Sequence, residues 1–164
     1  FNPDETVEVH PVIKDYFSLK ELSDKLLLFF TGHTRDASKV LKSQADATVD
    51  KFETLKKMRN LVPALKKTIE NSEHDAFGRL MHENWLLKKS LTSDISNRKL
   101  DEYYQNALDS GALGGKLLGA GGGGFLCFYA NLNKQKSVIN SLSNLYNLEY
   151  EFENVGTQIT YYDQ

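Results

Sequence analysis

The chain has 164 residues, 40% hydrophobic and 26% charged, with a formal net charge of −2. That length suits one domain with a buried core, and the near-neutral charge argues against a nucleic-acid or membrane-surface protein. The longest apolar run, Leu26 to Phe30, has the length of a strand and is too short to span a membrane. Because Cys127 is the only cysteine, an internal disulfide is excluded and a reducing compartment is expected.

The N-terminal part of the chain predicts an extended segment, a short helix and a buried strand. Apolar and polar residues alternate across 6–13, which is typical of a strand. The spacing Ser18-Leu19-Lys20-Glu21 is that of a capping box, so a short helix is expected after Ser18. The run KLLLFF at 25–30 is followed by Thr-Gly and predicts a central strand of a sheet.

Helical periodicity dominates the middle of the chain. Apolar residues recur at three- and four-residue spacing from Ala37 to Ile69, and Pro63 is expected to divide this tract. Gly111 stands where a glycine ends a helix. The predicted helices cover about 35–60, 62–71, 75–91 and 98–110.

The C-terminal part changes its period. Strands are expected at 115–118 and 125–130, then a helix at 133–146 and an alternating strand at 148–152. Counted from Lys25, the order is strand, helices, strand, strand, helix, strand. This is the split β-α-β-β-α-β order of an α+β, ferredoxin-like sandwich with extra helices inserted in the first crossover.

A glycine-rich stretch separates the two expected central strands; it consists of Gly119, Ala120, Gly121, Gly122, Gly123 and Gly124. A glycine inside a folded element is destabilising by roughly 0.5–1 kcal/mol, so such a run indicates positive φ or a close approach. Its spacing matches the dinucleotide fingerprint, but that motif must open a helix, and a strand follows here. A tight turn suited to contact phosphates or another loop is favoured over a flexible linker.

Two further segments carry candidate binding residues. Thr31 and Arg35 lie between the buried strand and a long helix, whose N-terminus attracts anions. Arg35 could grip a phosphate or carboxylate, or it could simply be solvated. His82 and Trp85 share a helix face with Lys89 and could meet a sugar, unless Trp85 packs in the core. No spacing indicates a metal site, a general base or a nucleophile.

The stretch KLLGAGGGGFLCFYA resembles the third conserved motif of the GHMP sugar and isoprenoid kinases. Together with LLLFFTGHTRDASKVLKSQ and HENWLLKKSLTSDISN, in that order, it resembles the D-glycero-D-manno-heptose 7-phosphate kinases. The resemblance implies the ferredoxin-like fold of their C-terminal domain. Their serine- and glycine-rich phosphate loop does not occur in this sequence. The resemblance therefore implies that 1–164 are the C-terminal domain alone, without the N-terminal ATP-binding domain.

The same resemblance implies a cytoplasmic sugar kinase that uses ATP and Mg²⁺ to phosphorylate the anomeric hydroxyl of a sugar phosphate, for nucleotide-activated heptose synthesis. Its implied partners are the sugar phosphate, ATP and its own N-terminal kinase domain, with no nucleic acid and no membrane. No catalytic residue or metal ligand carries over to this chain, which is expected to be inactive alone.

By position, the glycine turn would support the phosphate loop of the missing domain. The substrate-side candidates are Thr31, Arg35, His82, Glu83, Trp85 and Lys88. Two alternatives stay open: a fucokinase-like sugar 1-kinase, and a stand-alone ferredoxin-like module for ligand binding or assembly.

Overall fold

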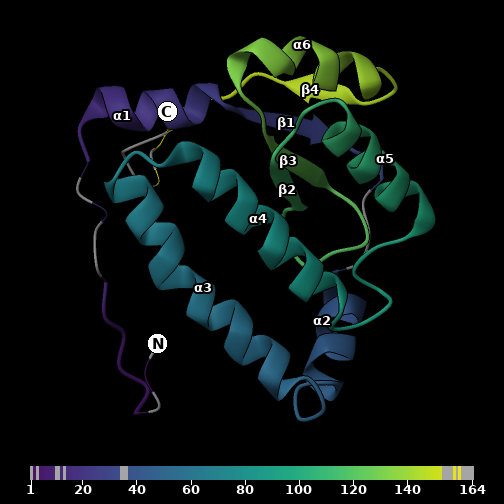
Figure 1. The fold of residues 1–164 in the computed structure, drawn as a ribbon. Helices are drawn as coiled ribbons and strands as arrows, with labels where there is room; N and C mark the ends of the chain where they lie inside the picture. The colour runs from purple at the N-terminus through teal and green to yellow at the C-terminus, as the bar shows by residue number, and fades with distance from the viewer. Residues whose placement is uncertain are drawn as a thin grey trace, which may run out of the picture.

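The computed structural model describes residues 2, 4–9, 12, 14–33, 37–152, 157 and 159. They form an α+β domain around a four-stranded antiparallel sheet with the strand order β2-β3-β1-β4 (Figure 1). The strands are β1 (Leu26–Phe30), β2 (Gly114–Leu117), β3 (Phe125–Tyr129) and β4 (Tyr146–Leu148). The helices are α1 (Tyr16–Asp24), α2 (Ala37–Asp46), α3 (Phe52–Glu70), α4 (His74–Lys89), α5 (Arg98–Asp109) and α6 (Leu132–Ser141). The predicted ferredoxin-like sandwich, with extra helices in the first crossover, is confirmed. One detail is corrected: β2, expected as a central strand, lies at the edge of the sheet, because β3 pairs with β1 on its other side.

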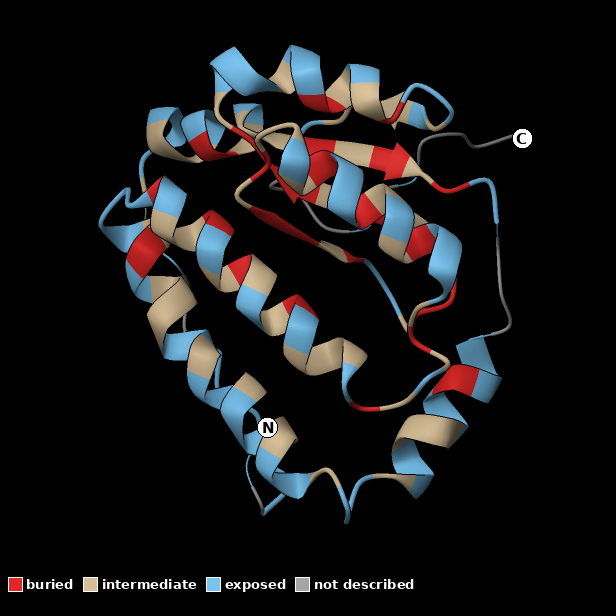
Figure 2. Cartoon of the chain, turned by 45° about the vertical axis from the view of Figure 1, so that its right-hand side comes forward, coloured by how far each residue is buried: buried red, intermediate tan, exposed pale blue. Residues whose placement is uncertain are grey.

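The sheet builds the main core on one of its faces. Leu27 and Phe29 of β1 pair with Phe128 and Leu126 of β3, so all of these side chains point to the same side. There they pack against α5 and α6 in one buried cluster. Figure 2 shows the buried residues on the strands and on the inner sides of the helices, while the outer sides are exposed. The alternation along β1 is that of a central strand with one fully buried face.

Helix α4 runs beside β2, and α3 lies along the outer side of α4 (Figure 1). The contact between α4 and β2 is made by glycines. A Cβ on Gly114 would overlap the carbonyl oxygen of Gly78 and would lie 2.8 Å from the amide nitrogen of His82. Small residues therefore let the two backbones touch, and this fixes the position of α4 relative to the glycine turn.

Replacing Gly114 by alanine is expected to lower the free energy of unfolding by about 3 kcal/mol, because the added methyl must push the two backbones apart. Urea unfolding measures this loss. Gly32→Ala is the control: Gly32 has φ +73° but no atom within 4 Å of the added methyl, so only the backbone strain of about 1–2 kcal/mol is expected. Equal losses in the two variants would contradict the contact argument.

The expected division of the long helical tract at Pro63 is wrong. Helix α3 continues through Pro63, and the chain instead turns between α2 and α3, at 47–51. Pro63 lies on the exposed side of α3, where water can bond the carbonyl that lost its partner. In the turn, β-branched Thr48 disfavours the helix, and its hydroxyl donates to the carbonyl of Gln44 at 3.1 Å.

The N-terminal expectations are also corrected. Residues 6–9 form no strand, and Val9 is 82% exposed, because no described strand lies beside this segment to take up its backbone groups. Positions 10, 11 and 13 of the expected strand lie outside the described residues. Helix α1 begins before Ser18, since the side chain of Asp15 caps it by accepting from the amide of Ser18 at 3.0 Å.

The helix expected at 133–146 and the strand expected at 148–152 are both shorter in the structure. Helix α6 ends at Ser141, and β4 forms before the expected strand at 148–152, overlapping it only at Leu148. The position of β4 is fixed by its pairing with β1, in which Leu148 opposes Leu28. Beyond it the chain leaves the sheet, and the hydroxyl of Tyr150 donates to the carbonyl of Ser23 at 3.3 Å.

Candidate functional site

The glycine turn has a backbone that only glycine adopts readily. It joins β2 to β3, and φ is positive at Gly119 (+79°), Gly121 (+132°), Gly122 (+76°) and Gly124 (+104°). In this region a Cβ clashes with the backbone of its own residue. The positive φ angles of the turn therefore explain why it consists almost entirely of glycine.

The end of β1 holds one side of the turn. The amide of Thr31 donates to the carbonyl of Gly124 at 2.9 Å, and the threonine hydroxyl donates to the same oxygen at 2.9 Å. The amide of Gly124 in turn donates to the carbonyl of His33 at 2.8 Å. Thr31 is only 3% exposed. The structure thus brings this predicted site residue to the glycine turn, where it acts as a buried anchor.

The other side of the turn is held by α2 and by the loop before α5. The amide of Gly122 donates to the carbonyl of Ile95 at 2.9 Å, and the side-chain amide of Gln44 donates to the carbonyl of Ala120 at 3.0 Å. A Cβ on Gly121 would lie 2.9 Å from the Cα of Ile95. Because the amides of Gly122 and Gly124 are already bonded to protein carbonyls, these two donors are not available to a phosphate.

Lys88 also reaches the turn. Its ammonium donates to the carbonyl of Gly119 at 2.5 Å. Burial, with a smaller contribution from the charge of Lys116, lowers the pKa of Lys88 from its ordinary value. Lys116 lies on β2, and its Nζ is 3.4 Å from Oδ1 of Asn84. Sequence reasoning selected Lys88 but missed Lys116 and Asn84.

His82 belongs to the packing between α4 and α5. Its Nδ1 lies 2.9 Å from the hydroxyl of Tyr104, and the two rings stack at 5.8 Å between centroids. The tyrosine hydroxyl donates to the carbonyl of Gly115 at 3.1 Å, so the histidine nitrogen is the donor toward Tyr104. Burial raises the pKa of Tyr104 above its ordinary value.

The other predicted residues of the substrate side do not join His82 in a common site. Trp85 is 0% exposed and packs against Tyr104. Of the two interpretations of Trp85, a sugar contact or a core residue, the structure thus agrees with the core residue. Its indole nitrogen is buried without a hydrogen-bond partner among the described residues. Glu83 is exposed to solvent. Arg35 lies outside the described residues.

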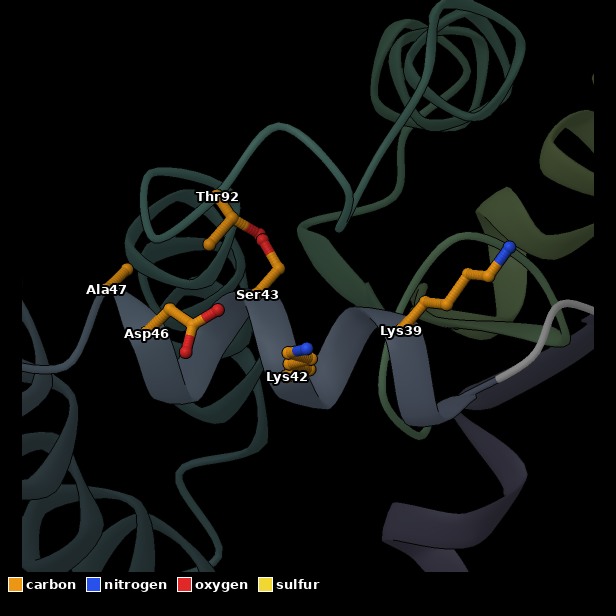
Figure 3. A pocket seen from close by; sticks show the side chains of 6 residues that line it. All are labelled: Lys39, Lys42, Ser43, Asp46, Ala47 and Thr92. Atoms are coloured by element: carbon orange, nitrogen blue, oxygen red, sulfur yellow. The ribbon is translucent and has the colours of Figure 1, made fainter.

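An open hollow runs along α2, and none of the predicted site residues is among those that line it (Figure 3). Its lining residues are Lys39, Lys42, Ser43, Asp46, Ala47 and Thr92. Within the described ranges, no three histidine, cysteine, aspartate or glutamate side chains gather to hold a metal ion. None of the helices described here has the length and apolar character needed to cross a membrane.

Comparison with known proteins agrees with this fold. The model of the family "GHMP kinases C terminal" matches residues 61–148. A D-glycero-alpha-D-manno-heptose 7-phosphate kinase from Campylobacter jejuni is 28% identical over 87% of this chain and 42% of the relative. A bifunctional fucokinase/GDP-fucose pyrophosphorylase from Arabidopsis thaliana is 30% identical over 73% of this chain and 12% of the relative.

A solved structure shares the fold as well. The mevalonate kinase of L. major, in complex with R-mevalonate, superimposes with a TM-score of 0.65 and 22% identity, over 74% of this chain and 40% of that chain. The chain thus spans less than half the length of each of these relatives. Because the family model covers more than half of the sequence, including strands β2 and β3 and the turn between them, the chain belongs to the GHMP kinase C-terminal domain family.

Proposed function

We propose that 1–164 are one domain of a cytoplasmic, ATP-dependent sugar kinase whose N-terminal domain is not part of this sequence. The whole enzyme transfers the γ-phosphoryl group of ATP to the anomeric hydroxyl of a sugar phosphate, D-glycero-D-manno-heptose 7-phosphate. The product serves nucleotide-activated heptose synthesis. Membership in the GHMP kinase family carries the reaction class, and the 28% identity to a heptose 7-phosphate kinase over 87% of the chain supports this acceptor.

In this proposal the role of the glycine turn is to support and position other groups of the enzyme, not to react with the substrates. Phosphoryl transfer depends mainly on aligning the two substrates and neutralising charge. The turn is held by Thr31, Gln44, Lys88 and Ile95, so its outer surface is a firm support for a second backbone. The described residues offer no metal-binding cluster, and we assign the binding of ATP and Mg²⁺ mainly to the N-terminal domain. This chain alone is therefore expected to have no kinase activity.

A second candidate is a fucokinase-like sugar 1-kinase. It is favoured by the 30% identity to the Arabidopsis fucokinase over 73% of this chain. The reaction at the anomeric hydroxyl is the same in both cases, and the two candidates differ in whether the acceptor already carries a phosphate.

The experiment is an acceptor panel with the natural protein that contains this chain. ATP consumption and the ³¹P spectrum of the product are measured with D-glycero-D-manno-heptose 7-phosphate, D-mannose 6-phosphate and L-fucose. We expect turnover and a new anomeric phosphate signal with the heptose phosphate. Preferred phosphorylation of L-fucose would establish the second candidate instead.

The 164-residue chain is assayed in parallel. Turnover by this chain alone would contradict the assignment of ATP binding to the N-terminal domain. If neither protein transfers phosphate to any sugar while the chain binds a small ligand, the chain is a binding module.

A further inference from the structure

Three donor side chains meet beside the glycine turn, on the contact between α4 and β2. Asn84 and Lys88 lie one turn apart on α4, and Lys116 projects from β2. The Nζ of Lys116 is 3.4 Å from Oδ1 of Asn84, and the Nζ of Lys88 donates to the carbonyl of Gly119. All three residues are partly exposed, so a ligand can reach them from solvent.

Within the part of the chain that the structure describes, no carboxylate balances the two positive charges of this cluster. Neither Lys88 nor Lys116 has a carboxylate oxygen within 4.0 Å among the described residues. The neighbouring Lys89 is different, because its ammonium pairs with Asp101 at 2.5 Å. Burial and the charge of Lys116 both disfavour the charged form of Lys88, and they lower its pKa. A bound anion would remove that repulsion.

A purely structural role explains only part of this arrangement. One N–H of Lys88 is used by the carbonyl of Gly119, but an ammonium has three donors. Lys116 contributes a charge to a strand that is otherwise glycine and leucine, and its hydrogen bond to Asn84 is long, at 3.4 Å. Because Oδ1 of Asn84 faces Lys116, its amide NH₂ is the group left to donate.

We propose that Lys88, Lys116 and Asn84 bind a phosphate monoester, namely the phosphate that the acceptor sugar carries away from its reacting hydroxyl. The assignment of this phosphate to the acceptor rests on the proposed function. Two ammonium groups and an amide match the charge and the acceptor oxygens of a phosphate dianion. Because these three side chains lie at Gly119, they hold the phosphate end of the sugar at one side of the turn. The end with the reacting hydroxyl stays free to reach the phosphoryl group that is transferred.

The first experiment uses the chain itself and inorganic phosphate as the probe. Phosphate is titrated into the 164-residue chain while the amide and lysine ammonium NMR signals are followed. Lys88→Met and Lys116→Met are each expected to raise the Kd for phosphate about tenfold. Lys136→Met is the matched control, because it removes an equal charge from the exposed side of α6 and should leave the Kd unchanged. Retained affinity in both test variants, or an equal loss in the control, overturns the site.

The second experiment separates the two sources of a phosphate group. In the natural protein, both test variants are expected to raise KM for the heptose phosphate about tenfold and to leave KM for ATP unchanged. A rise in KM for ATP alone would assign the lysines to the nucleotide and overturn the proposal. If the wild-type protein phosphorylates no sugar, the proposed function fails, and the assignment of this phosphate to an acceptor sugar fails with it. The phosphate titration of the chain then still decides whether the anion site itself exists.

Discussion

Truncation of Trp85 to alanine is expected to lower the free energy of unfolding by about 4 kcal/mol. Trp85 is 0% exposed, and its ring lies 5.8 Å from that of Tyr104 in the main core. Removing the indole leaves a large cavity between α4, α5 and the sheet, which the neighbouring glycine contact between α4 and β2 prevents from closing.

Urea unfolding of the chain measures the effect, with Leu86→Ala as the control. Leu86 is the next residue on α4 and is 51% exposed, so its truncation should cost no more than about 0.5–1 kcal/mol. A Trp85→Ala chain of wild-type stability would show that the ring is not part of the core. A raised KM for the sugar in that variant would then revive its interpretation as a substrate contact.

Replacement of Gly121 by valine is expected to reduce kcat/KM of the proposed kinase about 100-fold, through displacement of the turn. A Cβ at this position would lie 2.9 Å from the Cα and 3.1 Å from the carbonyl oxygen of Ile95, at φ +132°. The turn must therefore move away from the loop before α5, and its hydrogen bond from Gly122 to Ile95 is lost with it.

Gly119→Ala is the matched control for the shape of the turn. Its φ of +79° is also positive, but no atom lies within 4 Å of the added methyl. It should therefore lose about 1–2 kcal/mol of stability from backbone strain and keep most of the activity. Melting curves of both variants distinguish a displaced turn from an unfolded domain. Wild-type kcat/KM in Gly121→Val would show that the turn has no part in transfer.

The sequence predicted those features that depend on neighbours along the chain. The apolar run of β1 and the glycines between β2 and β3 are local patterns, and both were placed within about one residue. Pro63 misled the prediction, because whether a proline breaks a helix depends on whether water reaches the freed carbonyl, and burial is a tertiary property.

The contacts around the glycine turn could not be predicted in the same way. Thr31 meets the turn because the sheet order places β1 beside β3, whereas Gln44 and Ile95 reach it from α2 and from the loop before α5. Lys116 did carry a signal, since it is the one charged residue in the buried strand that precedes the turn. A charge in such a strand requires a partner or a ligand, and this criterion would have selected it.

The strand order also determines when the domain can form. Leu28 of β1 pairs with Cys127 of β3, and four helices of the first crossover lie between them in the chain. During synthesis, the apolar β1 therefore leaves the ribosome long before its partner exists. The α3–α4 pair is local and can assemble first, whereas the sheet closes late and slowly. Until it closes, the unpaired edges of β1 expose the nascent chain to aggregation.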